Sequence, residues 1–375
     1  MPSQDPTETL NLVNAGYVAD LYEQYRRDPS SVDPEWRSLF DSGAGGFEPA
    51  SAPAGSDNGG PATEAAVAPT TDAPASQPDA ARPQADATQP QREKPEVPTV
   101  PDGAVPIKGP AARLAQNMTA SLGVPTATSF REIGVATLER NRRALNARIA
   151  PKKVSFTHLI GWAIVQAADE QRSMSHAYTE IEGQAYRLDP GAINLGLAVD
   201  VERKDGSRFL VVPVIKRADG MDFAGFHARY EELVEKARTN RLSPDDFVGA
   251  TITLTNPGTL GTTASVPRLM PNQGTIVATG TIRDVGSERR MTVTSTYDHR
   301  IIQGAESGLF LQRIERLLAG EEGFYSEVFG SLGASEPDDG EPSDEDEDEE
   351  PEPAAAATAT SGAGAPPADL SLIHI

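Results

Sequence analysis

The sequence contains no cysteine, few aromatic residues and few basic groups. With no cysteine among its 375 residues, the chain cannot form disulfides, use a thiolate nucleophile or bind a metal through thiolates. Lysine and arginine number 33 against 55 acidic residues, and the net charge of −22 argues against a nucleic-acid partner. No apolar run approaches the roughly 20 residues that span a bilayer, and no secretory signal is present. These absences predict a cytoplasmic protein that binds neither nucleic acid nor membrane.

Large apolar side chains are missing from one long segment. Residues 48–105 lack leucine, isoleucine, methionine, phenylalanine, tryptophan and tyrosine, so they cannot bury enough apolar surface to fold. Because residues 46–105 are rich in alanine, proline, serine and aspartate, we predict an extended, disordered linker there. Residues 334–375 form a second low-complexity segment, and its run of twelve acids at 336–352 is typical of a solvated tail.

The chain before the linker, residues 1–45, shows two short helical patterns. Val18, Leu21 and Tyr25 recur at helical spacing, and Asp33 before a proline is typical of the start of a second helix. Such a pair is too small to be stable alone, and the linker offers it nothing apolar to pack on. An apolar face without a local core indicates a docking element.

Residues 106–333 have the composition of a folded domain. Helical patterns cover 136–149, 155–171, 223–237 and 306–318, and β-type patterns cover 126–135, 193–201, 209–215, 249–256, 275–284 and 290–297. Because consecutive strands lack helices between them, this order predicts a two-layer α/β sandwich and not a doubly wound sheet.

One histidine of this domain directly follows a β-type run. His299 stands between Asp298 and Arg300, after the run at 291–296 and before a helical pattern. A histidine at a strand-to-helix junction is presented from a rigid scaffold, and free imidazole has a pKa of about 6.5, which suits proton transfer at neutral pH. Because a lone histidine is more often structural, the interpretation needs a second pattern.

That second pattern lies upstream, where a strand-like alternation ends in a hydroxyl, an amide and a Pro-Gly turn. These groups belong to Thr255, Asn256 and Gly258. Together the two patterns resemble the catalytic domain of the dihydrolipoamide acyltransferases, the acyl-transfer components of 2-oxo acid dehydrogenase complexes. The family signature Asp-His-Arg-x-x-Asp-Gly corresponds to Asp-His-Arg-Ile-Ile-Gln-Gly at residues 298–304.

The resemblance extends from about residue 110 to residue 318, and it implies the trimeric fold that this family shares with chloramphenicol acetyltransferase. It also implies that His299 removes the thiol proton of coenzyme A, and that Thr255 donates a hydrogen bond to the tetrahedral oxyanion. In the family these two groups meet across a subunit interface. We therefore expect a homotrimer or a multiple of one.

The neighbours of these two residues have supporting roles in this interpretation. Asp298 and Arg300 are expected to fix the loop of the histidine through ion pairs. Asn256 and Gly258 are expected to shape the turn that aims the threonine. Gln303 departs from the family's aspartate and carries no charge, although the fused actinobacterial enzymes described next share it. Scattered histidines and the absence of cysteine predict no metal site.

Residues 17–36 resemble the N-terminal segment of thiamine-dependent 2-oxoglutarate dehydrogenases, which tethers the dehydrogenase to the acyltransferase core. Such a segment ahead of an acyltransferase domain resembles the actinobacterial multifunctional 2-oxoglutarate dehydrogenase/decarboxylases. This resemblance implies succinyl transfer between dihydrolipoamide and coenzyme A in the citric acid cycle. Lys94, the only lysine before residue 106, lies in linker composition, so the lipoyl group is expected in trans. The expected partners are a lipoyl-bearing acyltransferase subunit and dihydrolipoamide dehydrogenase.

The six residues 370–375 match neither neighbouring composition and resemble the translation of a sequencing adaptor. This predicts an artefactual end, with a dehydrogenase portion, its thiamine diphosphate and its magnesium beyond residue 369. Two other functions remain open from the sequence. One is a free-standing acetyltransferase of the chloramphenicol type, and the other is a non-catalytic trimeric scaffold, which Gln303 would mark.

Overall fold

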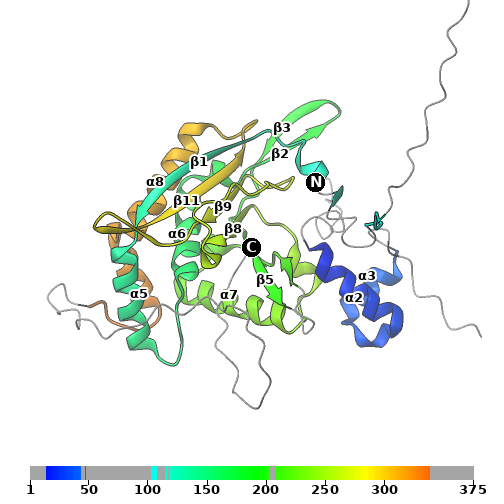
Figure 1. Ribbon diagram of the computed structural model, residues 1–375, viewed down its shortest axis with the longest axis horizontal. Coiled ribbons are helices and arrows are strands. Elements are labelled where there is room, and N and C mark those ends of the chain that lie inside the picture. The colour runs from blue at the N-terminus through cyan, green and yellow to red at the C-terminus, as the bar shows by residue number, and fades with distance from the viewer. Residues whose placement is uncertain are drawn as a thin grey trace, which may run out of the picture. The chain divides into compact units, whose positions relative to one another are not determined.

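The computed structural model in Figure 1 describes residues 14–43, 47, 103–107, 115–116, 118–202 and 208–337. Most of the predicted linker and tail, including the six terminal residues, lies outside the described residues. One compact unit contains Met1–Ala50 together with Lys108–Ile375, so the N-terminal helices and the predicted catalytic domain belong to the same unit. Within the described residues, no helix has both the length and the apolar character needed to cross a bilayer.

A mixed sheet of seven strands forms one layer of the fold. Its order is β1-β11-β9-β8-β4-β7, and β10 pairs with β11. The strands are β1 (Thr126–Gly134), β4 (Leu195–Leu197), β7 (Val214–Ile215), β8 (Ile252–Thr255), β9 (Thr275–Thr279), β10 (Arg283–Val285) and β11 (Glu288–Asp298). The central strands β4, β8 and β9 are parallel, and every other pairing is antiparallel. Every residue of β8 and β9 is buried, as expected for parallel strands in the middle of a sheet.

Two small sheets flank the main one. The first pairs β2 (Ala177–Ile181) with β3 (Gln184–Leu188), and the second pairs β5 (Val199–Glu202) with β6 (Arg208–Val211). Both pairings are antiparallel.

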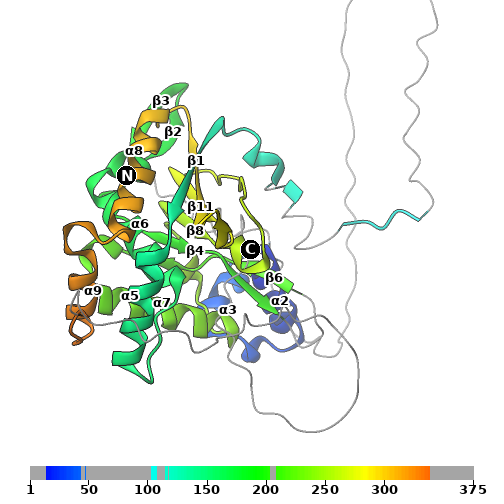
Figure 2. The same ribbon diagram turned by 60° about the vertical axis from the view of Figure 1, so that its left-hand side comes forward.

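Helices form the second layer, and Figure 2 shows α5, α6, α7 and α8 gathered on one side of the sheet. The α-helices that follow β1 are α5 (Ala136–Ile149), α6 (Phe156–Glu170), α7 (Phe223–Arg238), α8 (Gly304–Leu318) and α9 (Phe324–Ser331). Short 3₁₀ turns connect them, namely η3 (Arg172–Ser175), η4 (Ala218–Gly220), η5 (Pro244–Phe247), η6 (Pro257–Leu260) and η7 (Glu321–Gly323). The two-layer α/β sandwich predicted from the sequence is thus present.

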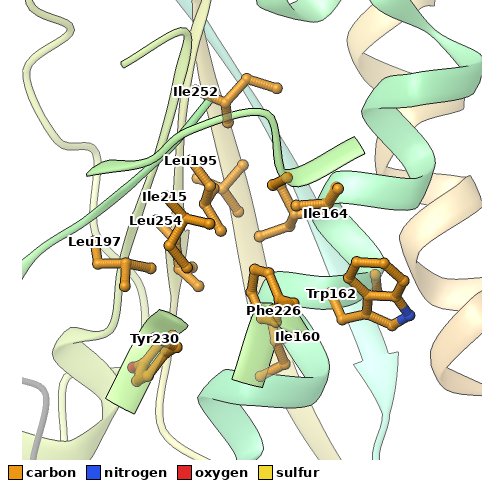
Figure 3. Close-up of a cluster of buried hydrophobic side chains, with 14 of the residues drawn as sticks. Ile160, Trp162, Ile164, Leu195, Leu197, Ile215, Phe226, Tyr230, Ile252 and Leu254 are labelled. Atoms are coloured by element: carbon orange, nitrogen blue, oxygen red, sulfur yellow. The ribbon is translucent and has the colours of Figure 1, made fainter. Parts of the chain in front are cut away.

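The core lies between α6, α7 and the central strands. Helix α6 is apolar on most of its circumference, which is typical of a helix buried on all sides. In Figure 3, Ile160 and Ile164 of α6 and Phe226 of α7 lie with Leu195 and Leu254 of the parallel strands. These contacts fix the position of the strand that ends at the predicted catalytic threonine.

The strand predicted over 275–284 is divided in the structure into β9 and β10. After Gly280, the backbone N–H of Thr281 donates to the carbonyl oxygen of Thr262 at 2.8 Å instead of continuing the ladder. A Cβ atom on Gly280 would lie 1.8 Å from the carbonyl oxygen of Thr263. The prediction of one continuous strand was wrong here, because the backbone at Thr281 is hydrogen-bonded to the loop at Thr262 and not to a neighbouring strand.

The two N-terminal helices are α2 (Ala15–Arg27) and α3 (Pro34–Asp41), joined by the 3₁₀ turn η1 (Pro29–Ser31). Asp33 caps α3 as expected, because its carboxylate accepts from the backbone N–H of Glu35 at 2.9 Å. Val18, Leu21 and Tyr25 are all buried, so the predicted apolar face of α2 is confirmed.

That apolar face packs on a distant part of the same chain. The N–H of Leu242 donates to the Tyr17 hydroxyl at 2.8 Å, and the indole N–H of Trp36 donates to the Leu242 carbonyl at 2.7 Å. The Tyr17 ring also lies 5.3 Å from the ring of Phe247 and 6.3 Å from that of Phe209, centroid to centroid. The sequence argument that these helices lack a neighbour therefore holds only for residues close in sequence.

Candidate functional site

The turn after β11 presents the predicted histidine. Asp298, the last residue of β11, is buried, whereas His299 is exposed. The N–H groups of Ile301 and Ile302 donate to the Asp298 carbonyl at 3.2 and 3.0 Å, and the N–H of His299 donates to the carbonyl of Pro125 at 2.9 Å. The histidine thus lies on a short hydrogen-bonded turn between a buried strand and α8.

The imidazole of His299 is oriented by its own turn. Its Nδ1 atom lies 3.0 Å from the carbonyl oxygen of Ile302. Because a carbonyl only accepts, Nδ1 carries the proton in neutral imidazole, and the lone pair is left on Nε2. The ring of Tyr297 lies edge-on at a centroid distance of 5.5 Å. This arrangement suits Nε2 to accept a proton.

Asp298 and Arg300 form the expected ion pair. The guanidinium of Arg300 donates to both carboxylate oxygens of Asp298, at 2.9 and 2.6 Å, and the backbone N–H of Arg300 donates to the same carboxylate at 3.0 Å. These bonds raise the pKa of Arg300 further above its ordinary value, so the arginine stays charged. The Arg300 guanidinium also lies 3.6 Å from the centre of the Tyr178 ring.

Gln303 lies in the position that follows this turn and precedes α8. Its side chain is exposed, and its backbone N–H donates to the Glu306 carboxylate at 2.7 Å. This contact caps the helix that follows the histidine.

The predicted oxyanion donor lies at the end of β8. Thr255 is buried, and Asn256 donates from its amide to the hydroxyl of Thr157 at 3.1 Å. A Cβ atom on Gly258 would lie 2.2 Å from the carbonyl carbon of Gly280, so only glycine fits there. These contacts hold the turn that follows the threonine.

Within one protomer the structure does not bring Thr255 and His299 together. Thr255 pairs with Ala278 of β9, which pairs with Thr294 of β11. At ~3.3 Å per residue, His299 lies about 16 Å further along β11 than Thr294. The two groups therefore occupy opposite ends of the central strands.

A cavity of about 640 Å³ opens between α5, α6 and α7. Its lining includes Thr157 and Thr259, which lie on either side of Asn256 at the end of β8. Four cationic side chains also line it, from Arg142, Lys152, Lys153 and Arg238, with one carboxylate from Glu231. The sequence analysis did not identify these cationic side chains as a cluster. Lys152 and Lys153, which shortly precede the start of the buried helix α6, were a signal that could have indicated it.

Two histidines in this cavity pack against each other. The rings of His158 and His227 lie 4.5 Å apart, and His158 also contacts Tyr230 at 4.2 Å. Burial lowers the pKa of His158, against the opposing effect of the hydrogen bond to Glu231. His158 is thus a buried packing residue of α6.

Ligand atoms of His158, His227 and Glu231 lie within 4.8 Å of one another, as in a metal site. The hydrogen bonds do not fit one. The Nδ1 atom of His158 accepts from the N–H of Ser155 at 3.1 Å, so its proton lies on Nε2, which faces Glu231 at 2.9 Å. A metal at Nε2 would have to displace that proton and leave an imidazolate, so these residues do not suit a metal.

Two protein-family models match the chain. The model of the 2-oxoacid dehydrogenases acyltransferase catalytic domain matches residues 100–324. The model of the 2-oxoglutarate dehydrogenase N-terminus matches residues 7–46. Both segments for which the sequence suggested a resemblance are thus matched.

Similar curated proteins are long, multifunctional enzymes. The chain is 44% identical to the multifunctional 2-oxoglutarate metabolism enzyme of Mycolicibacterium vanbaalenii, over 85% of this chain and 29% of that protein. It is 39% identical to the 2-oxoglutarate dehydrogenase E1/E2 component of Corynebacterium glutamicum, over 85% of this chain and 28% of that protein. The chain therefore spans less than a third of the length of these relatives.

Solved structures of dihydrolipoamide acetyltransferases share the fold. A probable enzyme of this kind from Listeria monocytogenes has a TM-score of 0.51 and 26% identity, and the match covers 59% of this chain and 97% of that one. The enzyme of Azotobacter vinelandii, studied for the roles of a serine, a histidine and an asparagine in its mechanism, has a TM-score of 0.52 and 28% identity, over 60% and 97% of the two chains. These likenesses confirm the predicted fold.

Proposed function

Because the chain belongs to the 2-oxoacid dehydrogenase acyltransferase family, we propose that it transfers succinyl groups between dihydrolipoamide and coenzyme A. The succinyl specificity is supported by the match to the 2-oxoglutarate dehydrogenase N-terminus and by the names of the similar long enzymes. In this proposal the chain acts in the cytoplasm, as the acyltransferase portion of a fused 2-oxoglutarate dehydrogenase of the citric acid cycle.

The observation that carries the proposal is the hydrogen bond between Nδ1 of His299 and the carbonyl of Ile302. It leaves Nε2 as an exposed proton acceptor on a rigid turn. A thiol has a pKa of about 8.5 and is mostly protonated at neutral pH, so it needs such a base. In the proposed reaction Nε2 takes the thiol proton of coenzyme A, and the thiolate sulfur attacks the succinyl carbon of succinyl-dihydrolipoamide.

The attack forms a new C–S bond and places a negative charge on the former carbonyl oxygen. The hydroxyl of Thr255 donates a hydrogen bond to this oxyanion, which lowers the barrier by stabilising the charge as it develops. The intermediate then collapses, the C–S bond to dihydrolipoamide breaks, and the imidazolium of His299 returns its proton to the departing thiolate. The products are succinyl-coenzyme A and dihydrolipoamide.

The separation of the two groups requires the threonine to come from a neighbouring protomer. In the proposed homotrimer, or a multiple of one, the sheet end that carries His299 would face the Thr255 end of the next subunit at each of three equivalent interfaces. In the Azotobacter enzyme a serine and a histidine were studied as catalytic residues, and Thr255 and His299 would supply the corresponding hydroxyl and imidazole.

Coenzyme A carries several phosphates, and the cationic cavity suits them. Lys152, Lys153 and Arg142 line a space that also contains Thr259, close to the strand end that bears Thr255. Phosphate groups bind readily to clustered lysine and arginine side chains. We assign this cavity to the nucleotide end of coenzyme A.

The remaining components of the proposed reaction come from elsewhere. The lipoyl group would be carried by a lipoyl-bearing acyltransferase subunit and reoxidised by dihydrolipoamide dehydrogenase. Thiamine diphosphate and magnesium would belong to a dehydrogenase portion that the long relatives' names suggest. Within that proposal, the present residues perform only the acyl transfer.

One competing function has an observation in its favour. Gln303 replaces a carboxylate of the family signature and makes no side-chain ion pair, which would suit a trimeric scaffold without activity. The free-standing acetyltransferase is disfavoured, because such an enzyme has no use for the N-terminal segment matched at residues 7–46.

Measuring the reverse reaction tests the proposal. The full chain is mixed with free dihydrolipoamide and succinyl-coenzyme A, and released coenzyme A is quantified by chromatography. We expect His299→Ala to lower kcat at least about 100-fold. Lys216→Ala, which removes only an exposed ion pair with Asp245, is the surface control and keeps wild-type activity. Equal rates for wild type and His299→Ala would contradict the assigned base, and an inactive wild-type trimer would favour the scaffold.

A further inference from the structure

Figure 1 labels the strands β2 and β3, which form a two-stranded ribbon. Side chains of this ribbon contact the turn that carries His299. Its two strands are outside the main sheet, and every residue of β3 is exposed. Such a ribbon contributes little to the core. Its contacts with the catalytic turn are nevertheless specific and come from one cross-strand pair.

Tyr178 and Arg187 are direct partners in the β2–β3 ladder. Side chains directly opposite each other in an antiparallel pair point to the same face of the ribbon. On that face the Tyr178 ring lies under the Arg300 guanidinium at 3.6 Å, and the Arg187 guanidinium donates to the carbonyl oxygen of Ile301. One pair of residues therefore holds the turn at two points.

These two points lie between the two residues that the histidine's own hydrogen bond joins. Arg300 follows His299 directly, and Ile301 precedes Ile302, whose carbonyl accepts from the imidazole. The Ile302 carbonyl shares a peptide unit with the Gln303 N–H, which the Glu306 carboxylate holds at 2.7 Å. If either ribbon contact is lost, the backbone at Arg300 and Ile301 can move, and the imidazole then shifts away from this fixed acceptor. The Asp298 carboxylate binds the edge of the Arg300 guanidinium, and the Tyr178 ring covers its face. Together these contacts keep the guanidinium from turning to solvent.

From this geometry we infer that the Tyr178–Arg187 pair positions His299 for proton transfer. The inference rests on the proposed function, because it assigns the pair's effect to the base of that reaction. Neither side chain contacts the reacting atoms, so both are positioning residues. Their effect is on the orientation of the imidazole and therefore on kcat, since displacing a catalytic group by about 1 Å can cost about 100-fold in rate.

The test uses substitutions that separate stacking and hydrogen bonding from simple truncation. Tyr178→Ala and Arg187→Ala are each expected to lower kcat about 10- to 100-fold, with KM for succinyl-coenzyme A within about threefold of wild type. Tyr178→Phe keeps the aromatic face and is expected to retain at least about half of kcat. Arg187→Lys keeps a donor for the Ile301 carbonyl and is expected to recover part of the loss.

Tyr186→Ala is the matched control. Tyr186 precedes Arg187 on β3, so its side chain points to the opposite face of the ribbon, and it is 46% exposed. This variant removes the same aromatic group from the same ribbon without touching the catalytic turn. We expect wild-type kcat, and melting temperatures of all variants establish that the fold is intact.

The outcomes distinguish this inference from the proposed function. A fall in kcat for both alanine variants, with rescue by Tyr178→Phe and no effect of Tyr186→Ala, supports the positioning role. If His299→Ala abolishes transfer while Tyr178→Ala and Arg187→Ala keep wild-type kcat, the positioning role is wrong and the base assignment stands. If His299→Ala keeps wild-type activity, the proposed function is wrong and the positioning role falls with it. A higher KM with unchanged kcat in the two alanine variants would also overturn the positioning role.

Discussion

Thr255 and His299 lie at opposite ends of the central strands of one protomer, about 16 Å apart along the strand direction by the ladder register. Oxyanion stabilisation requires a donor within about 3 Å of the reacting oxygen, so these two groups cannot serve one reaction within a single chain. If both are catalytic, each active site combines the histidine of one subunit with the threonine of another.

Co-expression of two inactive variants tests the shared site. A chain with His299→Ala and a chain with Thr255→Ala are each inactive alone, but mixed trimers contain interfaces with both native residues. Random mixing in equal amounts gives one intact site in about four, so we expect about a quarter of wild-type activity. Activity is measured on the co-purified mixture, with the two chains carrying different affinity tags.

The double variant His299→Ala, Thr255→Ala on one chain, co-expressed with wild type, provides the comparison. Random mixing then leaves about a quarter of the interfaces with both native residues as well. Recovery in that pair but none in the mixture of single variants would refute a site shared between subunits.

Thr255→Ala removes the hydroxyl without changing the strand. We expect kcat to fall by about 100- to 1,000-fold, which corresponds to about 2.7–4 kcal/mol for one lost oxyanion donor. Thr255→Ser keeps a hydroxyl and is expected to retain most of the rate. A serine variant as slow as the alanine variant would show that the methyl group, and not the hydroxyl, is what the site needs.

Gly258→Ala tests how closely the turn after Thr255 approaches the backbone of Gly280 in the same chain. An added Cβ would lie 2.2 Å from the Gly280 carbonyl carbon, so the backbone must move. We expect a loss of at least about 2 kcal/mol in the free energy of unfolding, and a lower kcat because Thr255 shifts. Gly308→Ala, in helix α8 with open space around its Cβ position, is the control and is expected to raise stability slightly. Unfolding curves in urea measure both.

Much of the fold could be predicted from local patterns, whereas the roles of His299 and Thr255 were inferred from a family resemblance and stay a prediction. Helix α6 followed from its apolar stripe, and the turn at His299 from a strand-to-helix junction. The division between β9 and β10 could not be predicted, because the hydrogen bond from the N–H of Thr281 to the carbonyl of Thr262, a residue outside the sheet, decides it. The contacts of Arg187 with the catalytic turn were hidden for the same reason, since 114 residues separate it from Ile301. Long-range contacts of this kind have no periodic signal.

The docking of the N-terminal helices gives a pH-dependent prediction. Burial raises the pKa of the Tyr17 phenol above its ordinary value of 10, with a contribution from the carboxylate of Asp246. The folded chain therefore keeps this phenol neutral where the unfolded chain ionises it. The stability contributed by the neutral phenol is fully present below pH 10 and is lost as the pH rises through the higher pKa of the folded state.

Tyr17→Phe isolates this contribution. Above pH 10 the wild-type chain should lose about 1.4 kcal/mol more per pH unit than the variant, because one additional group ionises on unfolding. At neutral pH the variant should be less stable by about 1–3 kcal/mol, since the buried N–H of Leu242 loses its acceptor while Trp36 still satisfies the carbonyl. Urea unfolding at pH 8, 10 and 11, at one fixed protein concentration, measures both effects. Parallel losses in the two proteins between pH 10 and 11 would mean that Tyr17 is not buried against Leu242 and that the N-terminal helices do not dock as described.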